Sequence, residues 1–118
     1  MHTAKHDPFV CRVGESVQIT YNVTDKDGNP VSVAGANGNY KVSRELGDTA
    51  LLTKTVGAGL SLSGTQAVVS FLVSEIVETI DEEDVQIIGL VKDQLRIIKD
   101  GDDLVVANGS FTIEDVIR

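Results

Sequence analysis

The sequence predicts an all-β fold, an antiparallel sandwich with one short helical turn, and three observations carry this prediction. The 118 residues are 42% apolar but only 4% aromatic, without any Trp, so the core must be built mainly from Val, Ile and Leu, which suit pleated sheets. Apolar stretches recur as about seven to nine short strands at a spacing of about 8–12 residues. Eleven Gly and two Pro are typical of a chain with many tight turns. A chain of this length is expected to form one domain with a sizeable core.

The first long strand sets the frame for the rest of the chain. Over residues 17–23 every second side chain is apolar, which is the period of a strand buried on one face. The apolar positions are Val17, Ile19, Tyr21 and Val23. Residues 25–30 then form a turn, because Asp and Asn bond their own backbone, Gly28 tolerates positive φ, and Pro30 cannot donate to a central ladder.

Further strands are expected along the rest of the chain. Their ranges are 9–12, 40–46, 49–56, 60–64, 66–73, 85–92, 95–98, 104–107 and 110–113. The stretch 85–92 is apolar on both faces, as expected of a strand at the centre of the sandwich. Turns are expected at Gly47-Asp48, at Asp93-Gln94 and at Asp100-Gly101, of which the last is a strong two-residue hairpin signal.

One segment changes period. Over residues 74–80 the apolar side chains of Ile76, Val77 and Ile80 follow helical spacing, and Ser74 precedes them as a candidate N-cap. We expect one to two helical turns here, linking the two sheets.

The strand alternation also predicts which side chains form the core. They are Val17, Ile19, Tyr21, Val23, Tyr40, Val42, Val69, Phe71, Val85, Ile87, Phe111 and Ile113. Cys11 lies at a strand-like position and is expected as a buried structural thiol, and with no second Cys it forms no internal disulfide.

The chain is expected to divide into two parts. Residues 1–8 are interpreted as a flexible or partner-ordered N-terminal arm, and residues 9–118 as a single β-sandwich domain. The arm has two His, one Lys and one Asp but no periodic apolar face. It therefore has little burial of its own to offset the backbone entropy lost on ordering, about 1–2 kcal/mol per residue. It also lacks the apolar stretch of a secretory signal.

The charge balance disfavours some classes of partner. Lys and Arg number 10 against 18 Asp and Glu, a formal net charge of −8. Phosphate contacts need clustered Lys or Arg, and anionic membranes repel such a chain, so neither nucleic acid nor a membrane is expected as a partner. No apolar run approaches the ~18 residues of a membrane-spanning helix.

One turn begins like a calcium-binding loop. Asp25, Asp27 and Asn29 place oxygen atoms at alternate positions, but Gly28 is the fourth residue where an EF-hand needs Gly at the sixth, and Ala36 is the twelfth where a bidentate Glu is needed. A turn between strands explains these residues better.

Two other groups are weak metal candidates. The acidic run 81–84 would form a divalent-ion patch with Asp100, Asp102 and Asp103 only if the two loops lay at the same end of the domain. His2 and His6 have ligand spacing only on a helix, which nothing in the arm favours. We therefore expect no metal, no cofactor and no catalytic residue, with all carboxylates solvated in turns, and we expect that the chain is not an enzyme.

Several segments, taken in order, carry a resemblance to a known family. They are VQITYNVTDKDGNPVSVAGA, YKVSREL, QAVVSFLVSEIVETI, VQIIGLVKD and ANGSFTIEDVIR. This pattern resembles the immunoglobulin-like β-sandwich domains of tailed-phage virion proteins, including the N-terminal domains of baseplate upper proteins and tail-fibre-associated domains. The likeness runs from about Val13 to Arg118. One departure is the acidic run 81–84 and the aliphatic stretch 85–92, where the family has a small aromatic strand.

The resemblance implies a non-enzymatic structural protein of a bacteriophage virion, a tail or baseplate accessory or adaptor that assembles through subunit contacts. Its partners would be other virion structural proteins and further copies of itself, in a homo-oligomer or multi-copy assembly. Its location would be the virion, assembled in the host cytoplasm.

Two alternatives stay open: a protein that decorates the capsid, and a β-sandwich module that binds a glycan or receptor. Glycan sites commonly present aromatic faces, and the sequence places Tyr21, Tyr40, Phe71 and Phe111 at core-like positions, which disfavours the second. Sheet edges, with unpaired N–H and C=O groups, suit assembly instead.

Overall fold

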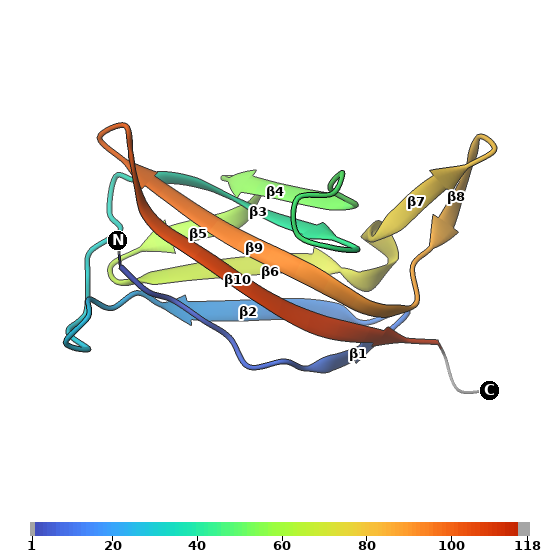
Figure 1. The fold of residues 1–118 in the computed structure, drawn as a ribbon, viewed down its shortest axis with the longest axis horizontal. Helices are drawn as coiled ribbons and strands as arrows, with labels where there is room; N and C mark the ends of the chain where they lie inside the picture. Colours follow the sequence, from blue (N-terminus) through green and yellow to red (C-terminus); the bar gives the residue numbers. More distant parts are fainter. Residues whose placement is uncertain (1, 116–118) are drawn as a thin grey trace.

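Strands make up most of the chain, so the all-β prediction is confirmed (Figure 1). The computed structural model describes residues 2–115. The strands are β1 (Val10–Arg12), β2 (Ser16–Asn22), β3 (Asn37–Ser43), β4 (Leu52–Val56), β5 (Gly59–Ser63), β6 (Gln66–Leu72), β7 (Val77–Ile80), β8 (Glu83–Gln86), β9 (Gly89–Lys99) and β10 (Asp102–Glu114). A turn of 3₁₀ helix, η1 (Val73–Glu75), lies between β6 and β7.

The strands form a large sheet and a small one. The large sheet has eight strands in the order β1-β10-β9-β3-β4-β5-β6-β2, and β7 and β8 form a separate two-stranded sheet. Most neighbours are antiparallel, as predicted, but β1 runs parallel to β10 and β4 runs parallel to β5. The antiparallel prediction is wrong for these two ladders.

The large sheet curls so that its two halves enclose one core. Strands β9 and β10 pass across β2, β5 and β6 (Figure 1). Phe71 of β6 lies 5.9 Å from the ring of Tyr40 on β3 and 6.0 Å from the ring of Phe111 on β10, measured between ring centroids. Aromatic contacts of this kind contribute about 0.5–1.5 kcal/mol beyond the area they bury.

The predicted core is confirmed except at two positions. Every predicted core residue is buried apart from Val17, which is only partly buried, and Val85, which is 43% exposed. Cys11 is also buried, as predicted, and burial raises the pKa of its thiol.

The hairpin predicted at Asp93-Gln94 is wrong, because β9 continues through it. Asp93 is 1% exposed and lies on the inward face of β9, in line with Val91, Leu95 and Ile97. It therefore behaves as a core residue, and the expectation that all carboxylates lie in solvated turns is also wrong.

A tight turn at Asp100 and Gly101 connects the last two strands, β9 and β10. Asp100 and Gly101 have φ of 54° and 85°, as a two-residue hairpin requires, so that prediction is confirmed. The predicted strands 104–107 and 110–113 are parts of the single strand β10.

The predicted helical segment 74–80 is mostly a strand. Only η1 is helical; its N-cap is Leu72 and not Ser74, and the Leu72 N–H donates to the Glu75 carboxylate (2.7 Å). The chain then forms β7, because β8 pairs with it across a turn at Asp81 and Glu82.

That hairpin also changes the environment of the stretch 85–92. Ile88 is 47% exposed and Leu90 is 58% exposed. The predicted strand at the centre of the domain is therefore wrong: the stretch is divided between β8 and the start of β9, and only part of it faces the core.

The strand predicted over residues 40–46 is shifted along the chain. The observed β3 starts at Asn37, because Gly38 can approach β9 closely: a Cβ there would lie 2.6 Å from the Arg96 carbonyl oxygen. It ends at Ser43, and Leu46 is 47% exposed in the loop that follows.

The N-terminal segment lies on its own domain. Its His2 N–H donates to the Leu104 carbonyl at the edge of β10 (2.8 Å), and Thr3 exchanges backbone hydrogen bonds of 2.8 and 2.9 Å with Thr24, just after β2. The Thr112 N–H of β10 donates to the Phe9 carbonyl (2.9 Å). Residues 2–9 thus bridge the two edges of the curled sheet, where the sequence suggested an arm with little burial of its own.

Candidate functional site

A group of polar side chains is buried around Asp93, in the middle of β9. Asp93 Oδ2 accepts a hydrogen bond of 2.7 Å from the Tyr40 hydroxyl on β3 and lies 2.6 Å from His6 Nε2. The Asp93 side chain has no exposed surface, and the His6 side chain is 8% exposed. The carboxylate is therefore held by a phenol and an imidazole, away from solvent.

Both ring nitrogens of His6 face oxygen acceptors. Nδ1 lies 2.8 Å from the Asp7 carbonyl oxygen, and Nε2 lies beside Asp93. A neutral imidazole has one N–H, so the imidazolium is the form that can donate to both oxygens. The hydrogen bond to Asp93 raises the pKa of His6, against the opposing effect of partial burial. With His6 protonated, the two residues form a buried ion pair.

The strand on the other side of Asp93 leaves room for this pair. Gly109 of β10 is the register partner of Asp93. A Cβ at this position would lie 2.6 Å from Asp93 Oδ1 and 2.8 Å from His6 Nε2. Any side chain here would displace one member of the pair, so the site requires glycine for close approach.

Aromatic rings surround the pair. The His6 ring lies 5.4 Å from the Phe9 ring and meets the Tyr21 ring edge-on at 5.6 Å. Burial is the main cause that raises the pKa of Tyr21 and of Tyr40, and the Asp93 charge adds to it. Both phenols therefore stay protonated. The Tyr21 hydroxyl and Asp93 Oδ1 are buried without a hydrogen-bond partner among the described residues.

The cluster contains the group types of a general acid and base, but its position gives it a structural role. A general acid or base must reach the proton it transfers, and Asp93 has no exposed surface from which to do so. What the pair does is join the N-terminal segment to β9. Breaking a buried pair of this kind costs about 3–5 kcal/mol, because it leaves an uncompensated charge.

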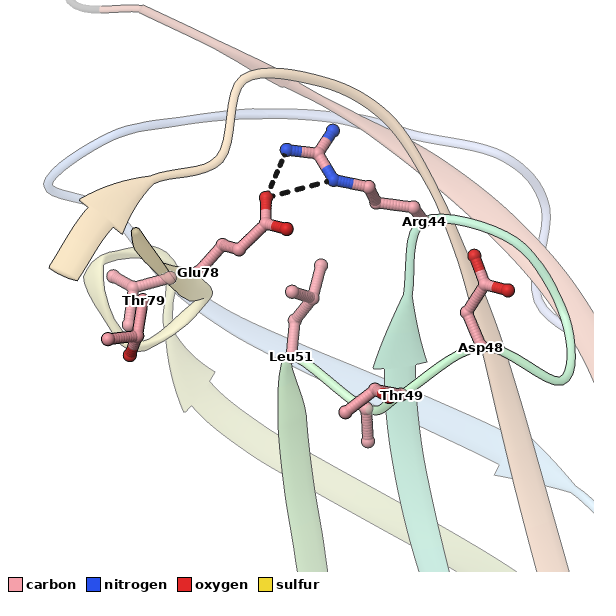
Figure 2. Close-up of a pocket in the computed structure, with 8 residues that line it drawn as sticks. Arg44, Asp48, Thr49, Leu51, Glu78 and Thr79 are labelled. Carbon is pink, nitrogen blue, oxygen red and sulfur yellow. Dashed lines mark hydrogen bonds and ion pairs between the residues drawn. The ribbon is translucent and has the colours of Figure 1, made fainter. Parts of the chain in front are cut away.

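The surface is hollowed between the loop after β3 and the β7-β8 hairpin (Figure 2). This groove has a volume of about 720 Å³. Its lining residues are Arg44, Asp48, Thr49, Ala50, Leu51, Val77, Glu78 and Thr79. Arg44 Nε and Nη2 lie 3.1 and 2.6 Å from Glu78 Oε2, so one ion pair spans the groove. Both side chains are exposed, and such pairs contribute at most about 1 kcal/mol.

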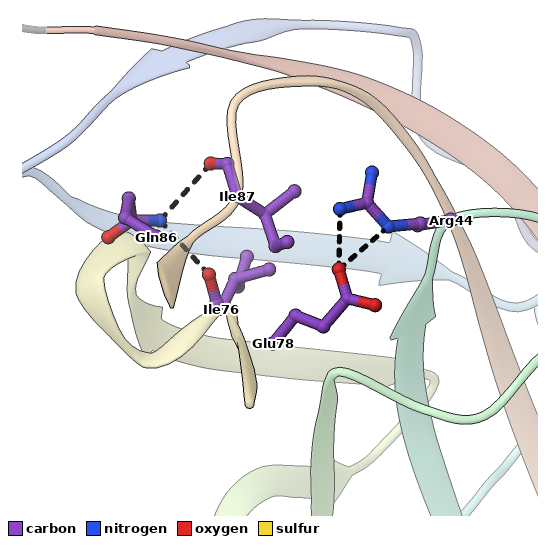
Figure 3. A network of polar contacts seen from close by, with 5 residues as sticks. All are labelled: Arg44, Ile76, Glu78, Gln86 and Ile87. Carbon is purple, nitrogen blue, oxygen red and sulfur yellow. Dashed lines mark hydrogen bonds and ion pairs between the residues drawn. The ribbon is translucent and has the colours of Figure 1, made fainter. Parts of the chain in front are cut away.

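The root of the hairpin is attached to the core (Figure 3). Gln86 Nε2 lies within hydrogen-bond distance of three carbonyl oxygens, those of Val73 (3.2 Å), Ile76 (3.0 Å) and Ile87 (3.2 Å). The side chains of Ile76 and Ile87 are buried. The root is therefore fixed, while the tip stands clear of the large sheet (Figure 1).

The turn that begins like a calcium loop bonds its own backbone. Asp25 Oδ1 accepts hydrogen bonds from the Asp27 N–H (2.9 Å) and the Asn29 N–H (3.0 Å). The Asn29 bond is the largest of the effects that lower the pKa of Asp25. Oδ1 of this carboxylate thus stabilises the turn itself, as predicted for a turn between strands.

The two acidic loops lie at opposite ends of β9. The run 81–84 precedes its start, and Asp100 follows its end. With 11 residues at about 3.3 Å each, the strand separates them by about 35 Å. They cannot form a shared ion patch, and no group of three or more His, Cys, Asp and Glu within residues 2–115 is arranged to hold a metal.

Sequence reasoning missed the Asp93 cluster, although two local signals point to it. The inward alternation of β9 continues through Asp93 instead of stopping there. Gly109 stands alone in the middle of a strand pattern, which often marks a close approach by another group.

No protein-family model matches this chain, and no curated protein matches it. Within the described residues, no helix has the length and apolar character to cross a bilayer.

Proposed function

We propose that this chain is an immunoglobulin-like β-sandwich. Immunoglobulin domains place strands B, E and D in one layer and strands G, F and C in the other, with C′ beside C in the variable type. Here β2, β6 and β5 are neighbours in the order of B, E and D, and β10, β9, β3 and β4 in the order of G, F, C and C′. The β7-β8 hairpin is then an insertion between E and F.

The function proposed for it is that of a non-enzymatic structural protein of a tailed-phage virion, a tail or baseplate accessory that assembles through subunit contacts. The carrying observation is the end of the molecule that bears the hairpin. Four of the eight large apolar side chains that are exposed within the described residues lie on the hairpin or from there to the start of β9: Ile80, Val85, Ile88 and Leu90. Exposed apolar groups on a projecting element are typical of protein contacts.

The aromatic residues favour assembly over glycan binding. All five belong to the enclosed part of the molecule: Tyr21, Tyr40, Phe71 and Phe111 are buried, and Phe9 stacks on Phe111 with 4.8 Å between ring centroids. None of these rings is free to stack on a sugar, and an aromatic face is the usual platform of a glycan site.

Immunogold labelling of phage particles from cultures that produce this chain tests the proposal. Label on the tail or baseplate is the expected result, and label over the head would favour the capsid-decoration alternative instead. Particles that carry no label, from cultures in which the chain is abundant, would overturn a virion role. Sedimentation of the purified chain from low to high micromolar concentration would give its own oligomeric state in parallel.

A further inference from the structure

Within the part of the chain that the structure describes, β7 pairs only with β8, so its outer edge has unpaired backbone groups. At the root of the hairpin, the Ile87 N–H donates to the Ile76 carbonyl (3.1 Å), and bonded positions recur at every second residue of β7. The intervening residues Val77 and Thr79 therefore direct their N–H and C=O groups away from β8. A strand edge of this kind can accept an additional strand.

This edge faces the groove rather than open solvent. Thr79 lines one wall, and Thr49 and Leu51 line the other (Figure 2); Val77 and Ala50 also belong to the lining. Its volume of about 720 Å³ is in the range of about 300–1,000 Å³ that ligand sites occupy. A short extended segment that entered it would meet the backbone of β7 on one side and Leu51 on the other.

The side chains of the hairpin set the pattern of such a segment. Glu78 and Ile80 lie on one face of the hairpin together with Val85, and Ile80 and Val85 are 47% and 43% exposed. Glu83 lies on that face too, whereas Val77 and Thr79 lie on the other. An added strand in which Lys or Arg alternates with apolar residues would place its basic side chains on the face of Glu78 and Glu83 and its apolar side chains on the face of Val77 and Thr79.

The charge of the hairpin agrees with that pattern. Residues 77–86 contain no Lys or Arg, and their carboxylates belong to Glu78, Asp81, Glu82, Glu83 and Asp84. Asp48 adds a carboxylate on the opposite wall of the groove. The exposed Arg44–Glu78 pair spans the groove and is weak, so Arg44 would swing aside and a Lys or Arg of the segment would replace it beside Glu78. A basic partner is therefore favoured over an acidic one, including a second copy of this chain with its net charge of −8.

We propose that an extended basic segment of another protein, with Lys or Arg alternating with apolar residues, binds along β7 in this groove as an added strand. The inference rests on the proposed assembly function and names the surface and the chemistry of the partner. Main-chain hydrogen bonds to Val77 and Thr79 supply affinity, and the carboxylates supply selectivity.

A capped peptide of alternating Val and Lys is the probe, with a peptide of alternating Val and Glu as its charge control. In titrations of the isotope-labelled protein followed by NMR, the Val-Lys peptide should shift the amides of Val77 and Thr79 and slow their hydrogen exchange. The Val-Glu peptide should do neither. Shifts confined to other strands, equal binding of both peptides, or no binding would overturn the proposal.

Two variants separate backbone pairing from simple charge attraction. Thr79→Pro removes the outward N–H, which β8 does not use, and should weaken the Val-Lys peptide about three- to tenfold, the value of one hydrogen bond. Thr79→Val keeps that N–H while removing the side-chain bond to Asp84, so it is the matched control and should bind like the wild type. Unchanged resonances of Val85 would show that the hairpin persists in both variants. Equal binding by all three proteins would refute strand addition.

Charge selectivity has its own matched pair. Glu83→Lys should weaken binding of the Val-Lys peptide. Asp27→Lys makes the same change in charge in a distant turn and should not weaken binding. If both variants lose the same affinity for the Val-Lys peptide, binding depends only on the net charge of the protein, and the proposal is contradicted. If the Val-Lys peptide binds but immunogold finds no label on the particles, the β7 surface is supported and the proposed virion function is refuted. If the particles are labelled but the peptide does not bind, the virion function is supported and the β7 surface is not the subunit contact.

Discussion

Replacement of His6 by Ala should lower the free energy of unfolding by about 3–5 kcal/mol, the cost of leaving one member of a buried ion pair without its partner. After the change Asp93 keeps only the Tyr40 hydrogen bond, in a site where its side chain has no exposed surface. Because domains of this size are stable by about 5–15 kcal/mol, the loss is a large fraction of the total.

The same pair predicts how stability depends on pH. The folded-state pKa of His6 is raised above its ordinary value of 6.5, mainly by the Asp93 hydrogen bond. The stabilisation that the His6–Asp93 pair gives the fold is therefore complete below about pH 6.5, the ordinary pKa that His6 has in the unfolded chain. It is lost as the pH rises through the higher folded-state pKa. Between the two pKa values the folded chain binds one more proton than the unfolded chain. In that range the free energy of unfolding falls by at most about 1.4 kcal/mol per pH unit as the pH rises. Asp93→Asn should weaken this dependence, because it removes the carboxylate whose hydrogen bond and charge raise the His6 pKa, while the smaller effect of Asp7 remains.

Urea titrations of the wild type, His6→Ala and His2→Ala at several pH values measure both effects. His2→Ala is the control, because its backbone bond to Leu104 is retained and its ring lies outside the cluster. A broken buried ion pair should cost more than about 1 kcal/mol. If the free energy of unfolding of His6→Ala lies within about 1 kcal/mol of the wild-type value and depends on pH in the same way, the ion-pair explanation is refuted.

Three further changes test the core and the closure of the fold. Phe71→Ala should cost about 3–5 kcal/mol in a denaturant titration through the cavity it leaves, and a loss under ~1 kcal/mol would contradict the observed packing. Gly109→Ala should cost about 1–3 kcal/mol by overpacking against Asp93, so an unchanged melting temperature would mean that the close approach is not constrained. A chain that begins at Phe9 lacks His6 and should be about as destabilised as His6→Ala; if its thermal unfolding matches the full chain, the segment is not part of the fold.

The all-β fold class and most of the turns could be predicted from the sequence. The alternation of residues 17–23 places Ile19, Tyr21 and Val23 in the core, and the turns at 25–30 and at Asp100-Gly101 form where their residue types predict. These features depend on a period of two and on backbone chemistry within a few residues, so they can be read locally.

The parts that sequence reasoning missed depend on residues far away along the chain. An Asp is typical of a turn unless donors can reach it in the core, and here those donors come from Tyr40 and His6, 53 and 87 positions away in the chain. The same holds for the stretch 85–92, whose exposure was decided by the pairing of β7 with β8. Such features depend on long-range contacts, because a carboxylate is buried only where the fold brings its partners to it.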